Sequence, residues 1–230
     1  LRCLGTGSGD TSGATDYATI QAALTAARSA GGGFVLGNAG QTYYINAPLE
    51  IGTGTTLDMT GCTIVLASGS NCLMLANYSS LHSVATGALA ASSGSTLFTS
   101  SSTSDGIYLN AAAGQTFVVP MTYGGVSAKY VGTIAGNPNT ATRQFNADHA
   151  SVSTIGYTAA TLYNRDSRII VRGGVWNRGT NGSGDTETNH AFRFRGLDGL
   201  IVDGCTFISS GSNGRYAVLM QNVTSVNVTN

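Results

Sequence analysis

The chain has 230 residues, with 11 basic and 11 acidic side chains and a formal net charge of zero. Only 10% of the residues are charged, whereas globular proteins typically have about 25%. Nucleic-acid binding needs a basic face, which this balance excludes. No apolar run reaches the roughly 18 residues of a membrane span, so we expect no membrane insertion. The 32 glycines and the frequent short β-branched runs instead indicate an all-β protein.

One segment near the start has helical periodicity. Ile20, Ala23, Leu24 and Ala27 follow the i, i+3, i+4, i+7 pattern, which predicts a helix over residues 16–30. Thr15 or Asp16 is the expected N-cap, and the glycines that follow Ala30 end the helix. Its apolar stripe consists largely of Ala, so we expect it to lie closely over the first part of the fold as a cap.

Two sequence motifs, here called phrases, recur along the chain. Residues 57–64, LDMTGCTI, match residues 200–207, LIVDGCTF, and the segment 167–176 fits the same template 31 positions before its counterpart at 198. A second phrase, at 190–200, aligns with 216–226 at an offset of 26. A repeat with a period between the twenties and the low thirties predicts a solenoid.

Side chains alternate within these repeats with a period of two. Phe192 and Phe194 fall at core positions, and Arg193 and Arg195 fall between them, on the expected outer face. Each coil would pair in parallel with its neighbours. The sequence therefore predicts an all-β fold, a right-handed single-stranded parallel β-helix with an N-terminal capping α-helix.

Three regions are expected along the chain. Residues 1–84 hold the cap helix and the first coils, and residues 161–230 hold further coils that stop inside a repeat. Residues 85–160 break the pattern with a Ser/Thr-rich stretch, interpreted as a loop or linker, and then short strands. We interpret this part as an insertion between coils and not as a second independent domain. The interrupted last repeat implies either a longer protein or partner chains that cover the edge.

The sequence contains no motif for a metal or a nucleotide. Cys3, Cys62, Cys72 and Cys205 have neither CxxC spacing nor a His at zinc-finger distance, so we expect small buried side chains and leave their disulfide state open. No P-loop, dinucleotide fingerprint or GxSxG segment occurs. We expect no cofactor and no bound metal.

Arginines and aromatic residues concentrate in the later coils. Such a surface suits acidic sugars, because guanidinium groups pair with carboxylates and rings stack on sugar faces. The alternative is that these arginines form ladders on the surface of the coils, in local ion pairs with Asp198 and Asp203, and have no ligand. The candidate carbohydrate-binding residues are Arg172, Trp176, Arg178, Arg193, Arg195, Arg215 and Tyr216.

Catalytic candidates are weaker. Asp185 and Glu187 are two closely spaced carboxylates on one predicted loop, and paired carboxylates can hydrolyse glycosidic bonds. A solvated turn explains the same spacing. His190 begins a strand and could act as a general base, although a lone histidine there is usually structural.

Several phrases resemble a known superfamily. ATIQAALTAARSAGGG and PLEIGTGTTLDMTGCTI resemble the opening of pectin-lyase-like right-handed parallel β-helix proteins. IIVRGGVWNRG and NHAFRFRGLDGLIVDGCTFISS are similar to coils of polygalacturonase-type glycoside hydrolases, and bacteriophage tail spikes and minor tail proteins share the superfamily. The resemblance implies the fold. In the hydrolases the catalytic carboxylates lie in coils beyond the phrase that ends this chain, so no catalytic role is carried over.

These observations favour a phage-type tail spike or minor tail protein of the virion tail that binds bacterial surface polysaccharide. The resemblance implies a homotrimer and other tail proteins as partners. The alternative is a secreted, extracellular enzyme, a glycoside hydrolase or lyase acting on uronic-acid polymers, and the third hypothesis is a cell-surface adhesin. Whether the protein is an enzyme that depolymerises its ligand stays open.

Overall fold

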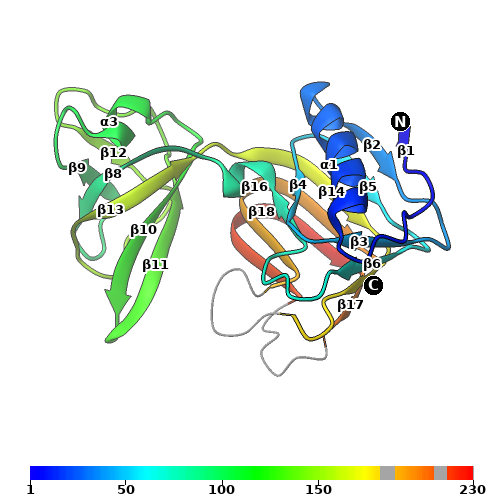
Figure 1. Ribbon diagram of the computed structural model, residues 1–230. Helices are drawn as coiled ribbons and strands as arrows, with labels where there is room; N and C mark the ends of the chain where they lie inside the picture. Colours follow the sequence, from blue (N-terminus) through cyan, green and yellow to red (C-terminus); the bar gives the residue numbers. More distant parts are fainter. Residues whose placement is uncertain (182–189, 210–216, 230) are drawn as a thin grey trace. The chain divides into compact units, whose positions relative to one another are not determined.

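The computed structural model describes residues 1–181, 190–209 and 217–229, and it divides into two compact units (Figure 1). The first unit comprises Leu1–Leu81 and Asp166–Asn230, and the second comprises His82–Arg165. The boundaries of the second unit lie a few residues outside the predicted insertion of 85–160.

Parallel strands build the first unit. In its described part, eight strands form a curled sheet in the order β1-β2-β5-β14-β16-β7-β4, with β18 beside β16, and four form a second parallel sheet in the order β17-β15-β6-β3. The curled sheet contains β1 (Arg2–Cys3), β2 (Gly33–Leu36), β4 (Leu49–Ile51), β5 (Thr55–Asp58), β7 (Leu75–Asn77), β14 (Asp166–Arg172), β16 (Phe192–Asp203) and β18 (Val218–Thr229). The second sheet contains β3 (Thr42–Ile45), β6 (Thr63–Leu66), β15 (Val175–Asn177) and β17 (Thr206–Ile208).

Successive passes of the chain stack in register, which places apolar side chains in ladders. Val35 pairs with Leu57, Leu57 with Val171, and Val171 with Val202. All four side chains are buried. Parallel strands buried on a shared core are expected to carry such β-branched and aliphatic runs. The mainly β architecture with a curled parallel sheet confirms this coarser part of the predicted fold.

Aromatic residues fill the space between the two sheets of the first unit. Trp176 is fully buried and meets Phe192 edge to face, with ring centroids 4.6 Å apart. Phe192 in turn contacts Phe207 with centroids 4.8 Å apart. The Trp176 Nε1 donates a hydrogen bond to the carbonyl of Gly173 at 3.1 Å, so its one polar atom is satisfied inside the core.

The predicted repeat offsets are found in the strand register. Ser167 pairs with Asp198, and Phe192 pairs with Val218. The match between 57–64 and 200–207 holds in the second sheet, where β15 lies between Thr63 and Thr206. In the curled sheet the alignment of the two segments shifts by two residues, so that Leu57 lies in line with Val202 and not with Leu200. The reason is that the turn before Cys62 is two residues longer than the turn before Cys205.

Helix α1 (Ala14–Ser29) packs on the first strands. It buries Ile20, Leu24 and Ala27, as the periodicity predicted, but it starts before the predicted residue 16. Gly13, in a left-handed conformation with φ of 79°, occupies the N-cap position without a side-chain hydrogen bond. Asp16 is buried inside the helix, and its carboxylate accepts hydrogen bonds from Ser8 N at 2.8 Å and Tyr44 N at 2.9 Å.

The chain leaves and re-enters the first unit at adjacent points. Helix α2 (Tyr78–Leu81) precedes the second unit, and Asp166 follows it. The buried Asp166 carboxylate accepts hydrogen bonds from Asn77 Nδ2 at 2.9 Å, Ser79 N at 2.8 Å and Thr53 Oγ1 at 3.1 Å. These bonds hold together the two ends of the insertion.

The second unit is an antiparallel sheet with its own core. Its strands run in the order β11-β10-β13-β8-β9-β12, and helix α3 (Gly106–Asn110) begins at Asp105, whose side chain caps it. Phe98, Phe117, Tyr130 and Phe145 form an aromatic cluster. The strands are β8 (Ser83–Ala91), β9 (Leu97–Ser100), β10 (Thr116–Tyr123), β11 (Val126–Thr133), β12 (Gln144–Asn146) and β13 (Ile155–Tyr163).

The structure of this unit differs from the sequence-based interpretation in one respect. The Ser/Thr-rich stretch that composition suggested as a loop or linker contains β8 and β9, which pair with each other and with β13 and β12. Leu89 of β8 and Phe98 of β9 enter the core of this unit.

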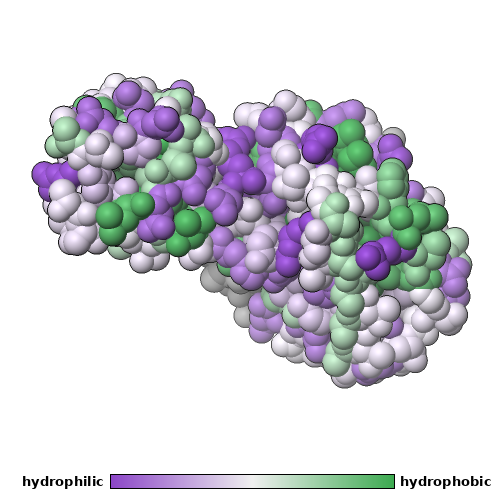
Figure 2. All heavy atoms as spheres, turned by 90° about the horizontal axis from the view of Figure 1, so that it is seen from above, coloured by the Kyte–Doolittle hydropathy of each residue, from purple (hydrophilic) through white to green (hydrophobic). Residues whose placement is uncertain are grey.

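The surface carries scattered apolar side chains. Figure 2 shows small hydrophobic patches between hydrophilic side chains on the face that it presents. Among the described residues, no helix is both long and apolar enough to cross a membrane.

Candidate functional site

A shallow groove crosses the turns between the curled sheet and the second parallel sheet. Its volume is about 280 Å³. Three stacked turns line it with glycine and threonine, at Thr60–Thr63, Gly173–Val175, Gly204 and Thr206. Gly173 is required here, because its φ is 61° and a Cβ atom would lie 2.6 Å from the Cα of Thr60. The two outer turns expose Thr60, Gly61, Gly204 and Thr206, whereas Gly173 and Gly174 of the middle turn are buried at the floor of the groove.

A row of charged residues stands directly before these turns. Arg172, at the end of β14, pairs in register with Asp58 of β5 on one side and with Asp203 of β16 on the other. Neighbouring strands lie about 4.8 Å apart, so two rungs separate the backbones of Asp58 and Asp203 by about 10 Å. Arg172 is exposed, and both carboxylates are half-buried.

Hydrogen bonds orient both carboxylates. Asp58 Oδ1 accepts from Thr60 N at 3.0 Å, and Asp203 Oδ1 accepts from the Thr229 hydroxyl. The Asp58 carboxylate is therefore tied to Thr60, which lines the groove, and the Asp203 carboxylate is tied to the neighbouring strand β18. Arg172 adds five fixed N–H donors between them, a geometry that suits bidentate binding of a carboxylate.

The thiol nearest this row is not a nucleophile. Burial, reinforced by the negative charge of Asp203, raises the pKa of Cys205 to about 12. Its Sγ donates to the Gly173 carbonyl at 3.2 Å. Because the thiolate is the reactive form, Cys205 is an inert part of the turn.

Most of the predicted arginine and aromatic surface is buried. Trp176 lies in the core, and Arg178 is 3% exposed, with its Nη2 donating to the Cys72 carbonyl at 3.2 Å. Burial lowers the pKa of Arg178. Of the seven candidate residues, Arg172 is the one that the described structure places at the surface beside a groove.

Arg193 and Arg195 lie on the side of β16 opposite Phe192 and Phe194, as the alternation predicted, but that side is covered. Arg193 Nη2 donates to the Ser80 carbonyl of α2 at 3.3 Å, and Arg195 Nε donates to Gln221 Oε1 at 2.8 Å. The two side chains are 7% and 4% exposed. The predicted outer face is therefore internal at this position, because α2 packs over it.

The remaining candidates do not join the groove. His190 is buried. Asp185, Glu187, Arg215 and Tyr216 lie outside the described residues. Within the described part of the chain, no group of three or more His, Cys, Asp or Glu side chains could hold a metal ion.

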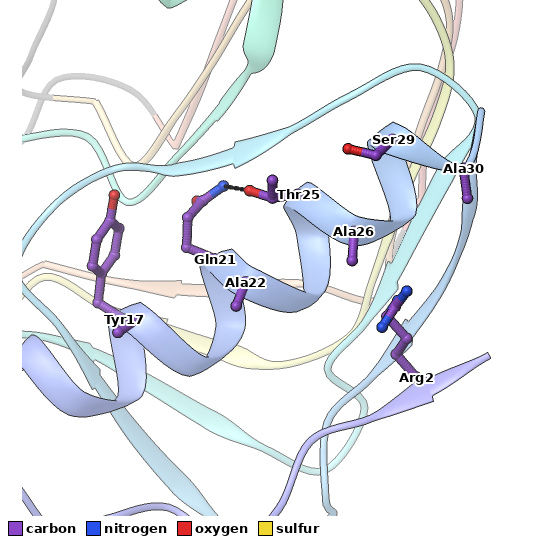
Figure 3. A pocket seen from close by; sticks show the side chains of 9 residues that line it. Arg2, Tyr17, Gln21, Ala22, Thr25, Ala26, Ser29 and Ala30 are labelled. Carbon is purple, nitrogen blue, oxygen red and sulfur yellow. Dashed lines mark hydrogen bonds between the residues drawn. The ribbon is translucent and has the colours of Figure 1, made fainter.

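A second hollow, of about 800 Å³, follows the outer face of α1. Figure 3 shows its small side chains, Ala22, Thr25, Ala26 and Ser29, with Arg2 at one end. Gln21 is engaged with Thr25 Oγ1 at 3.3 Å and with the backbone of Glu50. This hollow is the exposed back of the cap helix and offers no convergent functional groups.

Sequence reasoning missed Asp58 and Asp203 as members of one site. Both precede the Gly-Cys-Thr turns of the matched phrases 57–64 and 200–207, which was the available signal. The missing step was the register through β14, which places Arg172 between them.

Comparison with known proteins finds similarity at the level of structure. No protein-family model matches the chain, and no curated protein matches it. A tailspike protein from Pseudomonas phage LKA1 is similar with a TM-score of 0.52 and 15% sequence identity, over 93% of this chain and 39% of that chain. The tailspike of Acinetobacter baumannii bacteriophage AP22, solved with A. baumannii capsular saccharide, gives a TM-score of 0.41 and 11% identity, over 91% and 43%.

The likeness to the first tailspike concerns the fold. The chain spans less than half the length of either tailspike.

Proposed function

We propose that the chain is part of a phage-type tail spike or minor tail protein of the virion tail, which binds bacterial surface polysaccharide. Its curled sheet is then a right-handed parallel β-helix of the pectin-lyase type. The fold similarity to a tailspike supports this scaffold. The observation that carries the binding role is the groove over stacked glycine turns, bordered by Arg172 between Asp58 and Asp203.

The groove suits a long polar ligand better than a compact one. It crosses three coils, so a polymer lying along it would meet a turn about every 4.8 Å. Glycine and threonine allow close approach and offer hydrogen-bonding groups, and Arg172 offers a partner for an acidic sugar. A polysaccharide that contains uronic acids is long, carries many hydroxyl groups and has carboxylates that can pair with Arg172.

Binding of an acidic polymer to Arg172→Ala tests this function. Polygalacturonate and alginate serve as probes, with neutral dextran for comparison, and affinity is measured by biolayer interferometry. We expect the wild type to bind at least one acidic polymer, and Arg172→Ala to weaken this binding about tenfold or more.

The matched control is Arg168→Ala. Arg168 lies on the same strand and is also exposed, but Arg172 directly precedes Gly173 of the groove, whereas Arg168 stands near the other end of β14. Equal losses in the two variants would mean that net charge and not the groove binds the polymer. Absence of binding to either polymer would contradict the proposed ligand class.

A second candidate function is hydrolysis of the bound polymer. Asp58 and Asp203 flank Arg172 on one face, with backbones about 10 Å apart. An inverting glycosidase needs its two carboxyl groups roughly 6.5–9.5 Å apart, so this hypothesis requires the two side chains to lean slightly toward each other. In that reaction one carboxylic acid protonates the leaving oxygen while the other, as a carboxylate, activates a water molecule on the opposite face of the sugar.

Mass spectrometry of the polymer after incubation separates the two functions. New oligosaccharides with ordinary reducing ends, lost in both Asp58→Asn and Asp203→Asn, would establish a hydrolase, and unsaturated ends would indicate a lyase. Retained binding without cleavage supports the receptor-binding role.

We also propose a homotrimer that contacts other tail proteins, as the resemblance to tail spikes implies. Light scattering of the purified chain tests the trimer, since a subunit of 23.4 kDa predicts a particle of about 70 kDa. A monomer at micromolar concentration would contradict it.

A further inference from the structure

The second unit has a surface feature unrelated to the groove. The first residues of β13 lie between two neighbouring cavities of about 380 and 350 Å³, and Thr154 and Ile155 line both. The larger cavity is bounded by β10 and β11, and the smaller lies over β8, β9 and β12. In Figure 1, β13 runs between β8 and β10.

Two irregularities of strand pairing open these cavities. β10 pairs with β13 only through Thr116–Val118, so the two strands part beyond that point. On the other side, Ile155 pairs with Ala91 and Thr158 pairs with Leu89. Between these two pairs the chain advances by three residues on β13 but by only two on β8. This is a β-bulge, which inserts one extra residue and redirects a side chain.

The bulge turns Tyr157 outward. In a regular strand Tyr157 would share the buried side of Ile155, but Gly156 and Tyr157 are exposed in succession. Tyr157 is 58% exposed and lines the smaller cavity. An aromatic ring held at the edge of a cavity, next to a glycine, is free to stack on a flat ligand face.

The polar groups around Tyr157 are neutral. Gln144 Nε2 donates to Thr99 Oγ1 at 3.2 Å, which positions the amide in the smaller cavity. Hydroxyl groups of Ser92, Ser95 and Thr154 complete the polar lining. No charged side chain lines either cavity. Such a lining offers no partner for phosphate or carboxylate groups, whereas it matches the hydroxyl groups of a neutral sugar.

We propose that Tyr157 and its two flanking cavities form a binding site for neutral oligosaccharides. Tyr157 stacks on the C–H face of one sugar ring, Gln144 and the serine and threonine hydroxyls bond to its hydroxyl groups, and adjacent sugar units extend into the cavity on the other side of β13. The site is distinct from the Arg172 groove and selects a different chemical class of saccharide.

Calorimetric titration of the full chain tests the site. The probes are maltohexaose, cellohexaose and laminarihexaose, three neutral hexasaccharides that differ in linkage. We expect at least one to bind, Tyr157→Ala to weaken that binding tenfold or more, and Tyr157→Phe to retain it within about threefold because the ring is kept.

Tyr123→Ala is the matched control. Tyr123 is also 58% exposed and belongs to β10 of the same unit, but it lines neither cavity. It should bind as the wild type does. The proposal is overturned if none of the three hexasaccharides binds, if Tyr157→Ala binds like the wild type, or if Tyr123→Ala loses as much affinity.

The test is independent of the proposed function. Arg172→Ala should leave hexasaccharide binding unchanged, and Tyr157→Ala should leave polygalacturonate or alginate binding unchanged. Failure of one site therefore does not produce failure of the other.

Discussion

At the scale of single residues, depth in the stack decides what a side chain contributes. Phe194 is fully buried, whereas Met220, its in-register partner on β18, is 41% exposed. We expect Phe194→Ala to lower the free energy of unfolding by about 3–5 kcal/mol, because it leaves a cavity in a packed core. Met220→Ala is the control and should cost about 1 kcal/mol or less.

Denaturant unfolding followed by tryptophan fluorescence measures both variants. Trp176 is the one tryptophan of the chain and is buried in the core of the first unit, so its emission reports that unit. Equal costs for the two substitutions would contradict the assignment of Phe194 to the interior of the stack.

We expect the four cysteines to differ in reactivity because they are buried to different degrees. The structure describes them as free thiols, with Cys3 exposed and Cys62 buried. At pH 8 a pKa of about 12 leaves about one Cys205 thiol in ten thousand ionised, and only the thiolate is alkylated. Brief treatment with iodoacetamide should therefore label Cys3 and spare Cys205 until the protein is unfolded. Peptide mass spectrometry reads the result, and fast labelling of native Cys205 would contradict it.

The residue scale also shows where sequence patterns were sufficient. Alternation correctly separated Phe192 and Phe194 from Arg193 and Arg195. It could not reveal that α2 covers the arginines, because alternation gives the direction of a side chain and not what packs against it. The same limit applies to Tyr157, because its exposure depends on a β-bulge that the sequence pattern does not predict.

At the scale of elements, Asp16 connects the cap helix to the sheet. The sequence suggested Asp16 as a helix cap. Its buried carboxylate instead accepts two backbone hydrogen bonds, from Ser8 and from Tyr44 of β3. Bonds to a charged group contribute about 1.5–3 kcal/mol each, so Asp16→Ala should cost about 3 kcal/mol. Trp176 fluorescence during urea unfolding measures the loss.

Asp10→Ala is the control for this prediction. Its exposed carboxylate bonds to Ser12 and Thr15, close to it in the chain, and these bonds lower the pKa of Asp10 to about 2. It makes no bond to a strand, so its removal should destabilise the protein less than removal of Asp16. A larger effect of Asp10→Ala would mean that the loop before α1, and not Asp16, holds the helix in place.

At the scale of the whole molecule, the repeats could be predicted because each coil carries the same pattern, and the strand register reproduces offsets of 31 and 26. An insertion between coils was predicted, but the register of β5 against β14 could not be: the matched segments align Leu57 with Ile169, whereas Leu57 pairs with Val171. This pairing creates the row of Asp58, Arg172 and Asp203. The candidate groove therefore forms because a coil that precedes the second unit in sequence pairs with a coil that follows it.

Those ends meet closely enough for the second unit to be removed. Ser79 N lies 2.8 Å from the Asp166 carboxylate, and Asn77 Nδ2 lies 2.9 Å from it. A Gly-Ser linker of about four residues in place of 82–165 can therefore join Leu81 to Asp166 without strain. Because the first unit has its own core, we expect the shortened chain to be soluble and to unfold in one cooperative transition, followed by Trp176 fluorescence.

Ligand binding by the shortened chain then assigns each saccharide to a unit. It should bind polygalacturonate or alginate as the full chain does, since Arg172 and the groove are retained, and it should lose hexasaccharide binding with Tyr157. An insoluble product would mean that the second unit is needed for the coils to fold. Retained hexasaccharide binding would place the neutral-sugar site in the first unit and contradict its assignment to β13.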